Sequence, residues 1–197
     1  SLRDLKAEGF QPMAISSLLS KVGTSDSVDI FKDINQIIFD FDIEKFGKSK
    51  PKFDKNELKF LNSKYFKLLD FEDIYDQLKN FNFEVTSGFW ELVKDNIENI
   101  KQIETWWHII YGKIKPVYND TDFIKTCLQN LPNGNFNENT WSTWTSNIMK
   151  VSGRKGKDLY NPLRLCLTGQ HRGPEMATLV LLMGRKKIIE RLSLNDL

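Results

Sequence analysis

Cysteine, histidine and long apolar runs are scarce in this sequence of 197 residues. Its two cysteines, Cys127 and Cys166, and its two histidines, His108 and His171, are scattered without the spacing of metal ligands. They support neither a zinc module nor a disulfide scaffold, and we expect a reduced, cytoplasmic setting. No run of 18 apolar residues occurs, which argues against a membrane-spanning helix. The first residues, SLRDLKAEGF, lack the apolar segment of a signal peptide, so we expect none.

What is present is the composition of a globular protein, with 40% hydrophobic, 12% aromatic and 27% charged residues. A chain of this length buries a core without disulfides or metal. The net charge is +2, but residues 150–197 contribute +6, which leaves −4 for the rest. A basic end on a mildly acidic body indicates an anionic partner, with phosphate the usual candidate. The alternative that charge alone leaves open is a solvated helical face.

Helical periodicity dominates the N-terminal part of the chain. Pro12 at a first-turn position, followed by apolar residues three and four apart, predicts a helix that Gly23 ends. A second helix is predicted over residues 28–38 from the spacing of its apolar side chains. The alternating segments FDIEKF and KPKF, separated by Gly47-Lys48-Ser49, predict a small β-hairpin near residues 39–53.

Two aspartates mark the next helix starts. Asp54, with Glu57 three residues later, predicts a capping box and a helix lined by leucines, and Asp70 predicts another cap. From Ser87 onward the pattern is entirely helical. The predicted apolar stripes are Phe89-Val93-Ile97, Ile103-Trp107-Ile110, Phe123-Cys127-Leu131 and Trp141-Trp144-Ile148.

The C-terminal segment is predicted to form three short helices. Asn161-Pro162 is typical of a cap and a first helical residue, and Gly169 would end that helix. Gly173-Pro174 would start a helix that Gly184 ends, before a final amphipathic helix.

No catalytic constellation is present in the sequence. His108 follows two tryptophans on a helical face and is interpreted as structural, and His171 lies in a loop beside an arginine, which disfavours a base. The basic stretch over residues 153–157 lacks the spacing and the terminal Ser or Thr of a Walker A loop. It is either a flexible basic turn or a contact for nucleic-acid phosphates. Trp141 and Trp144, three residues apart, fit a core better than base stacking.

The C-terminal string is the most specific feature. It runs Gly153-Arg154-Lys155-Gly156-Lys157-Asp158-Leu159-Tyr160-Asn161-Pro162-Leu163-Arg164-Leu165-Cys166-Leu167-Thr168-Gly169, followed by Gly173-Pro174-Glu175 and by a helix closing on Met183-Gly184-Arg185. This string strongly resembles the C-terminus of bacterial glutamyl-tRNA synthetases. Upstream, Glu8-Gly9-Phe10-Gln11-Pro12 with Ala14 resembles the helix entry after the family's Lys-x-Ser-Lys-Arg loop, and Asp54-x-x-x-Leu58-x-x-Leu61-Asn62-x-x-Tyr65 resembles its stem-contact segment. The resemblance covers nearly the whole chain and is loosest between residues 70 and 149.

This resemblance implies a mainly α fold. A small α/β stem-contact domain with the short hairpin would occupy residues 1–69, and a superhelical anticodon-binding bundle would occupy residues 70–197, divided into 70–149 and 150–197. The family's catalytic domain, which binds ATP, would precede Ser1, so we expect no cofactor and no ligase activity in this chain. The implied partner is tRNA, bound by a monomer, without a membrane.

The resemblance also implies roles for single residues. Arg164, in the Pro-Leu-Arg string, corresponds to the arginine that approaches the first anticodon base, and its planar donors suit a base edge. A surface ion pair is the alternative for this residue. Gly173 and Pro174, with Met176, correspond to the pocket for splayed anticodon bases.

Phosphate contacts form a second implied group. Their residues are Arg154, Lys155 and Lys157 in the C-terminal string and Lys55 and Lys59 in the stem-contact segment.

One position departs from the family pattern. Many members restricted to glutamate tRNAs carry an arginine in the turn after the first anticodon-domain helix, where it reads the third anticodon base. Here Asn96 aligns with that arginine, and the nearest cation, Lys94, lacks a bidentate fork. The resemblance therefore predicts a relaxed choice that includes glutamine tRNA.

Two functions follow from the sequence. The first is the tRNA-binding part of a glutamate–tRNA ligase. The second is a free-standing helical module that binds RNA or protein without a ligase. A nucleotide-binding domain encoded upstream would distinguish them.

Overall fold

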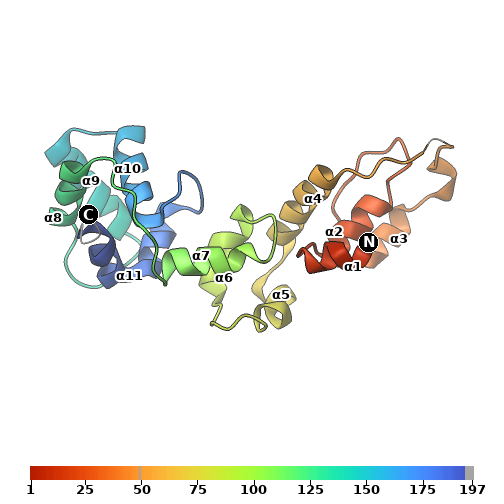
Figure 1. Cartoon of the computed structure of the whole chain (residues 1–197), viewed down its shortest axis with the longest axis horizontal. Coiled ribbons are helices and arrows are strands. Elements are labelled where there is room, and N and C mark those ends of the chain that lie inside the picture. Colours follow the sequence, from red (N-terminus) through yellow and green to blue (C-terminus); the bar gives the residue numbers. More distant parts are fainter. Residues whose placement is uncertain (49, 194–197) are drawn as a thin grey trace. The chain divides into compact units, whose positions relative to one another are not determined.

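The computed structural model describes residues 1–48 and 50–193 and divides the chain into two compact units, Ser1–Glu104 (unit 1) and Thr105–Leu197 (unit 2). The helices are α1 (Leu2–Ala7), α2 (Pro12–Leu19), α3 (Ile34–Asp40), α4 (Lys55–Leu68), α5 (Phe71–Leu78), α6 (Ser87–Val93), α7 (Gln102–Ile110), α8 (Thr121–Gln129), α9 (Thr140–Ser152), α10 (Lys157–Thr168) and α11 (Met176–Leu192), with 3-10 turns η1 (Ile43–Lys45) and η2 (Lys94–Asn96) (Figure 1). The predicted mainly α fold class is confirmed. The functional boundary predicted at residues 69/70 stays a prediction. None of the helices in the described ranges is long and apolar enough to cross a membrane.

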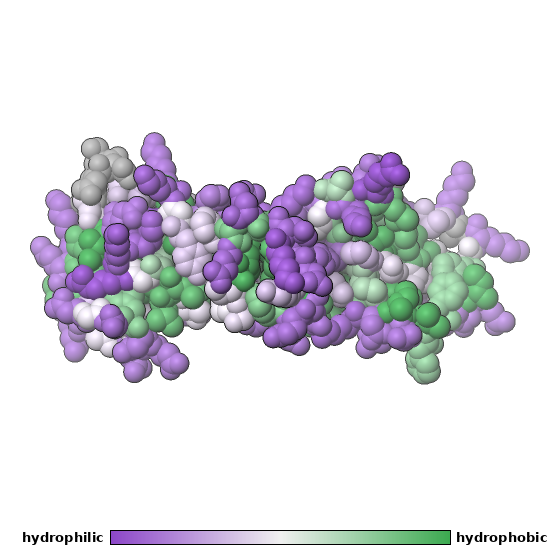
Figure 2. All heavy atoms as spheres, turned by 90° about the horizontal axis from the view of Figure 1, so that it is seen from below, coloured by the Kyte–Doolittle hydropathy of each residue, from purple (hydrophilic) through white to green (hydrophobic). Residues whose placement is uncertain are grey.

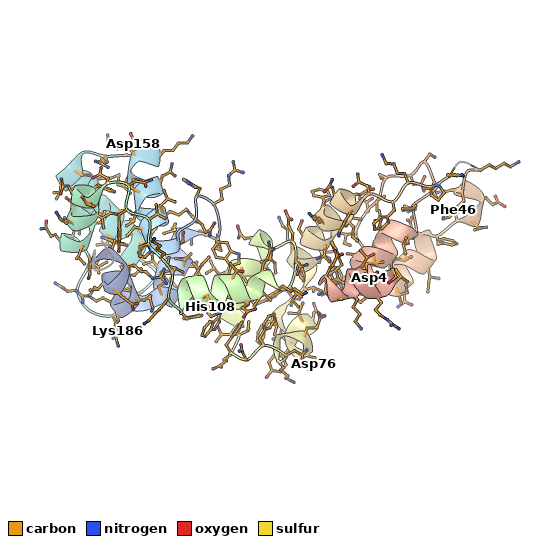
Figure 3. The ribbon with its side chains drawn as sticks, viewed as in Figure 1. Asp4, Phe46, Asp76, His108, Asp158 and Lys186 are labelled. Carbon is orange, nitrogen blue, oxygen red and sulfur yellow. The ribbon has the colours of Figure 1, made fainter. Side chains whose placement is uncertain are left out.

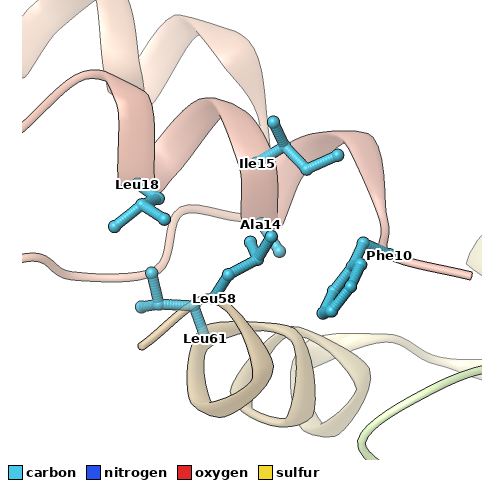
Figure 4. Packing of buried hydrophobic residues seen from close by; sticks show 6 residues of the cluster. All are labelled: Phe10, Ala14, Ile15, Leu18, Leu58 and Leu61. Atoms are coloured by element: carbon cyan, nitrogen blue, oxygen red, sulfur yellow. The ribbon is translucent and has the colours of Figure 1, made fainter. Parts of the chain in front are cut away.

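The core of unit 1 forms where α2 packs on α4. Phe10 and the buried side chains of α2 interleave with two leucines of α4, Leu58 and Leu61 (Figure 4). Each fully buried leucine or isoleucine contributes about 1.5–3 kcal/mol. Asn62, also buried, joins two distant segments: its Oδ1 accepts from the Gln11 N–H at 2.7 Å, and its Nδ2 donates to the Glu98 carbonyl at 2.6 Å. The predicted helices at Pro12 and after Asp54 are confirmed, but α2 ends at Leu19 rather than at Gly23. Asp54 caps α4 by accepting from the Asn56 N–H instead of forming the predicted capping box with Glu57.

The helix predicted over residues 28–38 is only half correct, because α3 begins at Ile34. The carboxylate of Asp33 accepts from the N–H groups of Asn35 and Gln36 at 2.8 and 3.2 Å, which caps the helix at that point. Residues 28–31 lie outside any helix, and Val28, Ile30 and Phe31 are partly buried while Asp29 is exposed. The apolar spacing over residues 28–38 therefore predicted a helix for a segment whose first part has no helical backbone.

The predicted hairpin near residues 39–53 is wrong. No described residue of this segment is in a strand, and Ser49, in its predicted turn, lies outside the described residues. Asp42 caps η1 by accepting from the Glu44 N–H at 2.9 Å, and the Gly47 N–H donates to Gly23 rather than across a hairpin. The apolar side chains also find no buried face, since Ile43 is 69% exposed. Figure 2 shows the hydrophobic surface that unit 1 exposes.

Unit 2 packs α8, α9, α10 and α11 around a core that contains the fully buried Trp144. One charged residue also lies in this core. Arg191 is 2% exposed, and its guanidinium donates to the carbonyls of Leu167 at 2.7 Å, Ile109 at 3.0 Å and Gly112 at 3.2 Å. These carbonyls lie at the C-terminal ends of α7 and α10, where the helix dipoles are negative. The two helix ends therefore stabilise this buried charge, and the nearby carboxylate of Glu190 adds to that stabilisation.

The boundaries of α10 and α11 correct the sequence prediction. α10 begins at Lys157 rather than near Asn161, so Pro162 lies inside the helix. The Tyr160 N–H closes the first turn on the Gly156 carbonyl at 3.0 Å, and the proline forfeits one later hydrogen bond. The end at Gly169 is confirmed by its left-handed conformation. In α11 the predicted break at Gly184 is present as non-helical backbone between two helical segments.

Candidate nucleic-acid interface

The loop between α10 and α11, residues 169–175, is held at both ends. At its start, Thr168 Oγ1 donates to the Arg164 carbonyl at 2.8 Å and accepts from the Gln170 N–H at 3.0 Å. At its end, the carboxylate of Glu175 accepts from the N–H groups of Ala177 and Thr178, both at 2.8 Å. The middle of the loop is exposed at residues 170–172. The protein therefore presents a fixed loop with an accessible tip.

Gly173 lies against an indole. Its φ is +151°, and a Cβ at this position would approach Cζ2 and Cζ3 of Trp106 to 3.1 Å and the ring's outer carbon more closely still. Only glycine allows the loop backbone to lie this near the ring. Trp106 is buried, while Trp107, which the sequence pattern placed on the buried stripe, is only partly buried. Sequence reasoning thus missed Trp106, although its neighbour on the same helix was singled out.

Arg164 connects α10 to this loop. Its Nη2 donates to the Pro174 carbonyl at 2.9 Å, while Nη1 is buried and has no hydrogen-bond partner among the described residues. Burial lowers the pKa of Arg164 from its ordinary value, and the charge of Glu175 opposes that shift. The side chain remains cationic because an arginine pKa lies far above neutrality. The predicted surface ion pair is absent from the described contacts of Arg164, and Nη1 stays buried with its donors unused.

Pro174 and Met176 are buried, Met176 at 6% exposure as the first residue of α11. The structure thus brings Arg164, Gly173 and Pro174 together around one loop, with Met176 at its base. The roles that the resemblance implies for them stay predictions.

Arg154 is engaged within the protein. Its Nη2 lies 2.6 Å from the Asp120 carboxylate, and its guanidinium lies 4.3 Å from the centre of the Phe123 ring. The pKa of Asp120 is lowered, first by the hydrogen bond from the Phe123 N–H and then by that from Arg154. Lys155 and Lys157 are exposed. These two lysines are therefore better placed than Arg154 to reach a phosphate.

The corrected start of α10 changes which candidates share a helix face. Lys157 and Arg164 are seven residues apart in one helix, so they lie on the same face about 10 Å apart. Asp158, at the surface beside Lys157, is labelled in Figure 3. A predicted phosphate contact and a predicted base contact are therefore aligned.

The remaining candidates belong to unit 1. Lys59 is exposed, and Lys55 pairs with Glu8 at 2.6 Å. Asn96 is exposed in η2. Lys94, in contrast, is 15% exposed, pairs with Glu91 at 2.7 Å and donates to the Leu69 carbonyl. The amide of Asn96 is therefore accessible, as is the carboxylate of its neighbour Asp95.

Comparisons with known proteins show the family and the fold of this chain. A family described as "Anticodon binding domain" matches residues 67–194. The chain is 40% identical to "Glutamate–tRNA ligase 1" of Maricaulis maris over 98% of this chain and 43% of that protein, and 39% identical to "Glutamate–tRNA ligase 1" of Ehrlichia chaffeensis over 100% and 44%. The solved structure of a glutamate tRNA ligase from Elizabethkingia meningosepticum covers 96% of this chain with a TM-score of 0.77 at 19% identity, which shows a shared fold. The chain spans less than half the length of the curated relatives it matches.

Proposed function

This chain belongs to the family of anticodon-binding domains, and we propose that it is the tRNA-binding part of a glutamate–tRNA ligase, which attaches glutamate to tRNA with ATP. The observation that carries the proposal is the family match over residues 67–194, which contains Arg164 and the loop it holds. The alternative, a free-standing module, has no comparable support, because relatives aligned over nearly the whole chain are named as ligases.

The geometry of unit 2 suits an RNA loop. Proteins that read single-stranded RNA pin unstacked bases with backbone groups, arginine planes and apolar walls. The loop over residues 169–175 supplies a fixed backbone, Arg164 supplies a positive charge beside it, and Lys155 and Lys157 supply charge for phosphates. In this proposal ATP binding and glutamate activation belong to the parent enzyme outside these residues, so the chain itself catalyses no glutamate-dependent ATP–pyrophosphate exchange.

A filter-binding comparison tests the proposal. Purified glutamate tRNA, glutamine tRNA and an unrelated tRNA are titrated with the chain at several salt concentrations. We expect salt-sensitive binding that favours glutamate tRNA over the unrelated one. Equal affinity for all three, or no binding at low salt, would contradict it.

Arg164→Ala examines the base contact within the same assay. Loss of a bidentate base contact costs about 1–3 kcal/mol and reduces discrimination at that base. The matched control is Arg3→Ala, which removes an exposed arginine from α1. If both variants lower affinity equally and leave the anticodon preference unchanged, Arg164 is not a base reader.

Asn96 supports a finer proposal, that the parent enzyme also charges glutamine tRNA. An asparagine amide offers a donor and an acceptor, so it suits either cytosine or guanine, whereas arginine offers donors only. Asn96→Arg in the full-length ligase should shift charging toward glutamate tRNA. An unmodified enzyme that rejects glutamine tRNA by several orders of magnitude would refute this proposal.

A further inference from the structure

Three aromatic rings lead from the core of unit 2 to its surface. Trp144 is fully buried, and its Nε1 donates to the Cys127 carbonyl at 2.8 Å. Trp141 meets it edge-on, with ring centres 5.9 Å apart and planes at 80°. Tyr160 of α10 also lies against Trp141, with ring centres 6.0 Å apart and planes at 33°, and is 38% exposed. The outermost ring is therefore supported from beneath by a fixed aromatic pair.

Two cationic residues neighbour this ring along α10. Lys157 precedes Tyr160 by three residues and Arg164 follows it by four, so both neighbour it on the same face of α10. A shallow hollow of about 410 Å³ lies against this helix, lined by Arg154, Lys157, Asp158, Asn161 and Pro162. Tyr160 does not line this hollow, and Arg154 there is paired with Asp120, so Lys157 is the cation that links the hollow to the face of α10 that carries Tyr160.

We propose that Tyr160 is a stacking platform for one unpaired base of the bound RNA. The inference rests on the proposed function and adds a contact that the arginine and the loop do not provide. A base can stack on a supported ring with little loss of side-chain entropy, because Trp141 already restricts the tyrosine. The same RNA strand would place phosphates near Lys157, one turn away. A cationic, aromatic surface of this kind favours RNA over an apolar protein partner.

Substitutions at Tyr160 test the platform. The probe is a fluorescein-labelled anticodon stem–loop of glutamate tRNA, and its affinity for the chain is measured by anisotropy as a function of salt. Tyr160→Ala should weaken binding about tenfold, in line with the loss of one base–aromatic stack. Tyr160→Phe, which keeps the ring, should bind within about twofold of the unmodified chain, since the two rings stack alike.

The salt dependence separates stacking from charge. Tyr160→Ala should leave the slope of log K against log salt unchanged, because stacking releases no counterions. Lys157→Ala should reduce the slope by roughly 0.7–0.9. Tyr75→Ala, which removes another exposed tyrosine on α5, is the matched control and should leave the affinity unchanged.

A second variant distinguishes the loss of base stacking from the loss of packing against Trp141. Tyr160→Leu keeps an apolar contact with Trp141 but has no ring, so it should bind as weakly as Tyr160→Ala while melting at the temperature of the unmodified chain. The inference is overturned if Tyr160→Ala or Tyr160→Leu binds the stem–loop like the unmodified chain. If the unmodified chain does not bind the stem–loop at low salt, the proposed function itself fails.

Discussion

Replacement of Arg191 by methionine should destabilise unit 2 strongly, because the buried carbonyls around the guanidinium lose their hydrogen-bond donor. Arg191 donates to three of them, and the Gly112 carbonyl keeps a second donor, Lys187 Nζ at 3.1 Å. The carbonyls of Leu167 and Ile109 lose this donor. Each buried group left unsatisfied costs about 1–3 kcal/mol.

The desolvation cost of the arginine offsets part of this loss. Burial of Arg191 lowers its pKa, which shows that the site disfavours the charge that the carbonyls stabilise. We expect a net decrease of about 3 kcal/mol in the free energy of unfolding, since methionine restores the packing but not the hydrogen bonds. For a unit of this size that corresponds to a fall in Tm of about 12–24 °C.

Urea unfolding followed by tryptophan fluorescence measures the effect. Four of the five tryptophans lie in unit 2, so the signal reports mainly on that unit. Lys186→Met, at an exposed position of the same helix, is the matched control and should change the free energy of unfolding by less than about 0.5 kcal/mol. A similar small change for Arg191→Met would refute the argument that helix-end carbonyls require this charge.

Three further outcomes follow from the same structure. Gly173→Ala should cost about 2–4 kcal/mol in urea unfolding because its Cβ meets the indole beneath it, whereas Gly134→Ala, also at positive φ but in open space, should cost about 1 kcal/mol. Cys127 and Cys166 are buried, and burial raises the pKa of both thiols to about 12. Iodoacetamide at pH 8 should therefore label them only after urea is added, and rapid labelling of the folded chain would contradict their burial. Hydrogen bonds lower the pKa of Asp120, so its stabilising contribution is present above the ordinary aspartate pKa near 4 and is lost as the pH falls through the lower folded value. Asp120→Asn should therefore make the free energy of unfolding, measured by fluorescence, fall less steeply at acid pH.

The sequence predicted the helical class, and it singled out site residues whose roles stay predictions. Pro12, Asp70 and Gly169 mark real helix ends because their signals are local: a fixed φ, a capping carboxylate and tolerance of left-handed backbone act within one turn. The C-terminal string likewise identified Arg164 and the glycine–proline pair by residue identity alone. These features do not depend on distant contacts, so the printed sequence suffices to find them.

Tertiary packing decided the rest. The segment predicted as a hairpin has alternating apolar residues but no buried face for them, and an alternating pattern specifies a strand only where one face is covered. Trp106 rather than Trp107 is buried because Gly173 lies on its ring, a contact between residues 67 positions apart that no local pattern encodes. The hydrogen bonds from Arg191 to carbonyls at two helix ends likewise join residues that are far apart in the sequence. Local chemistry thus determined several helix boundaries, although it misplaced the starts of α3 and α10, whereas long-range packing decided which faces the helices bury and which loop they position.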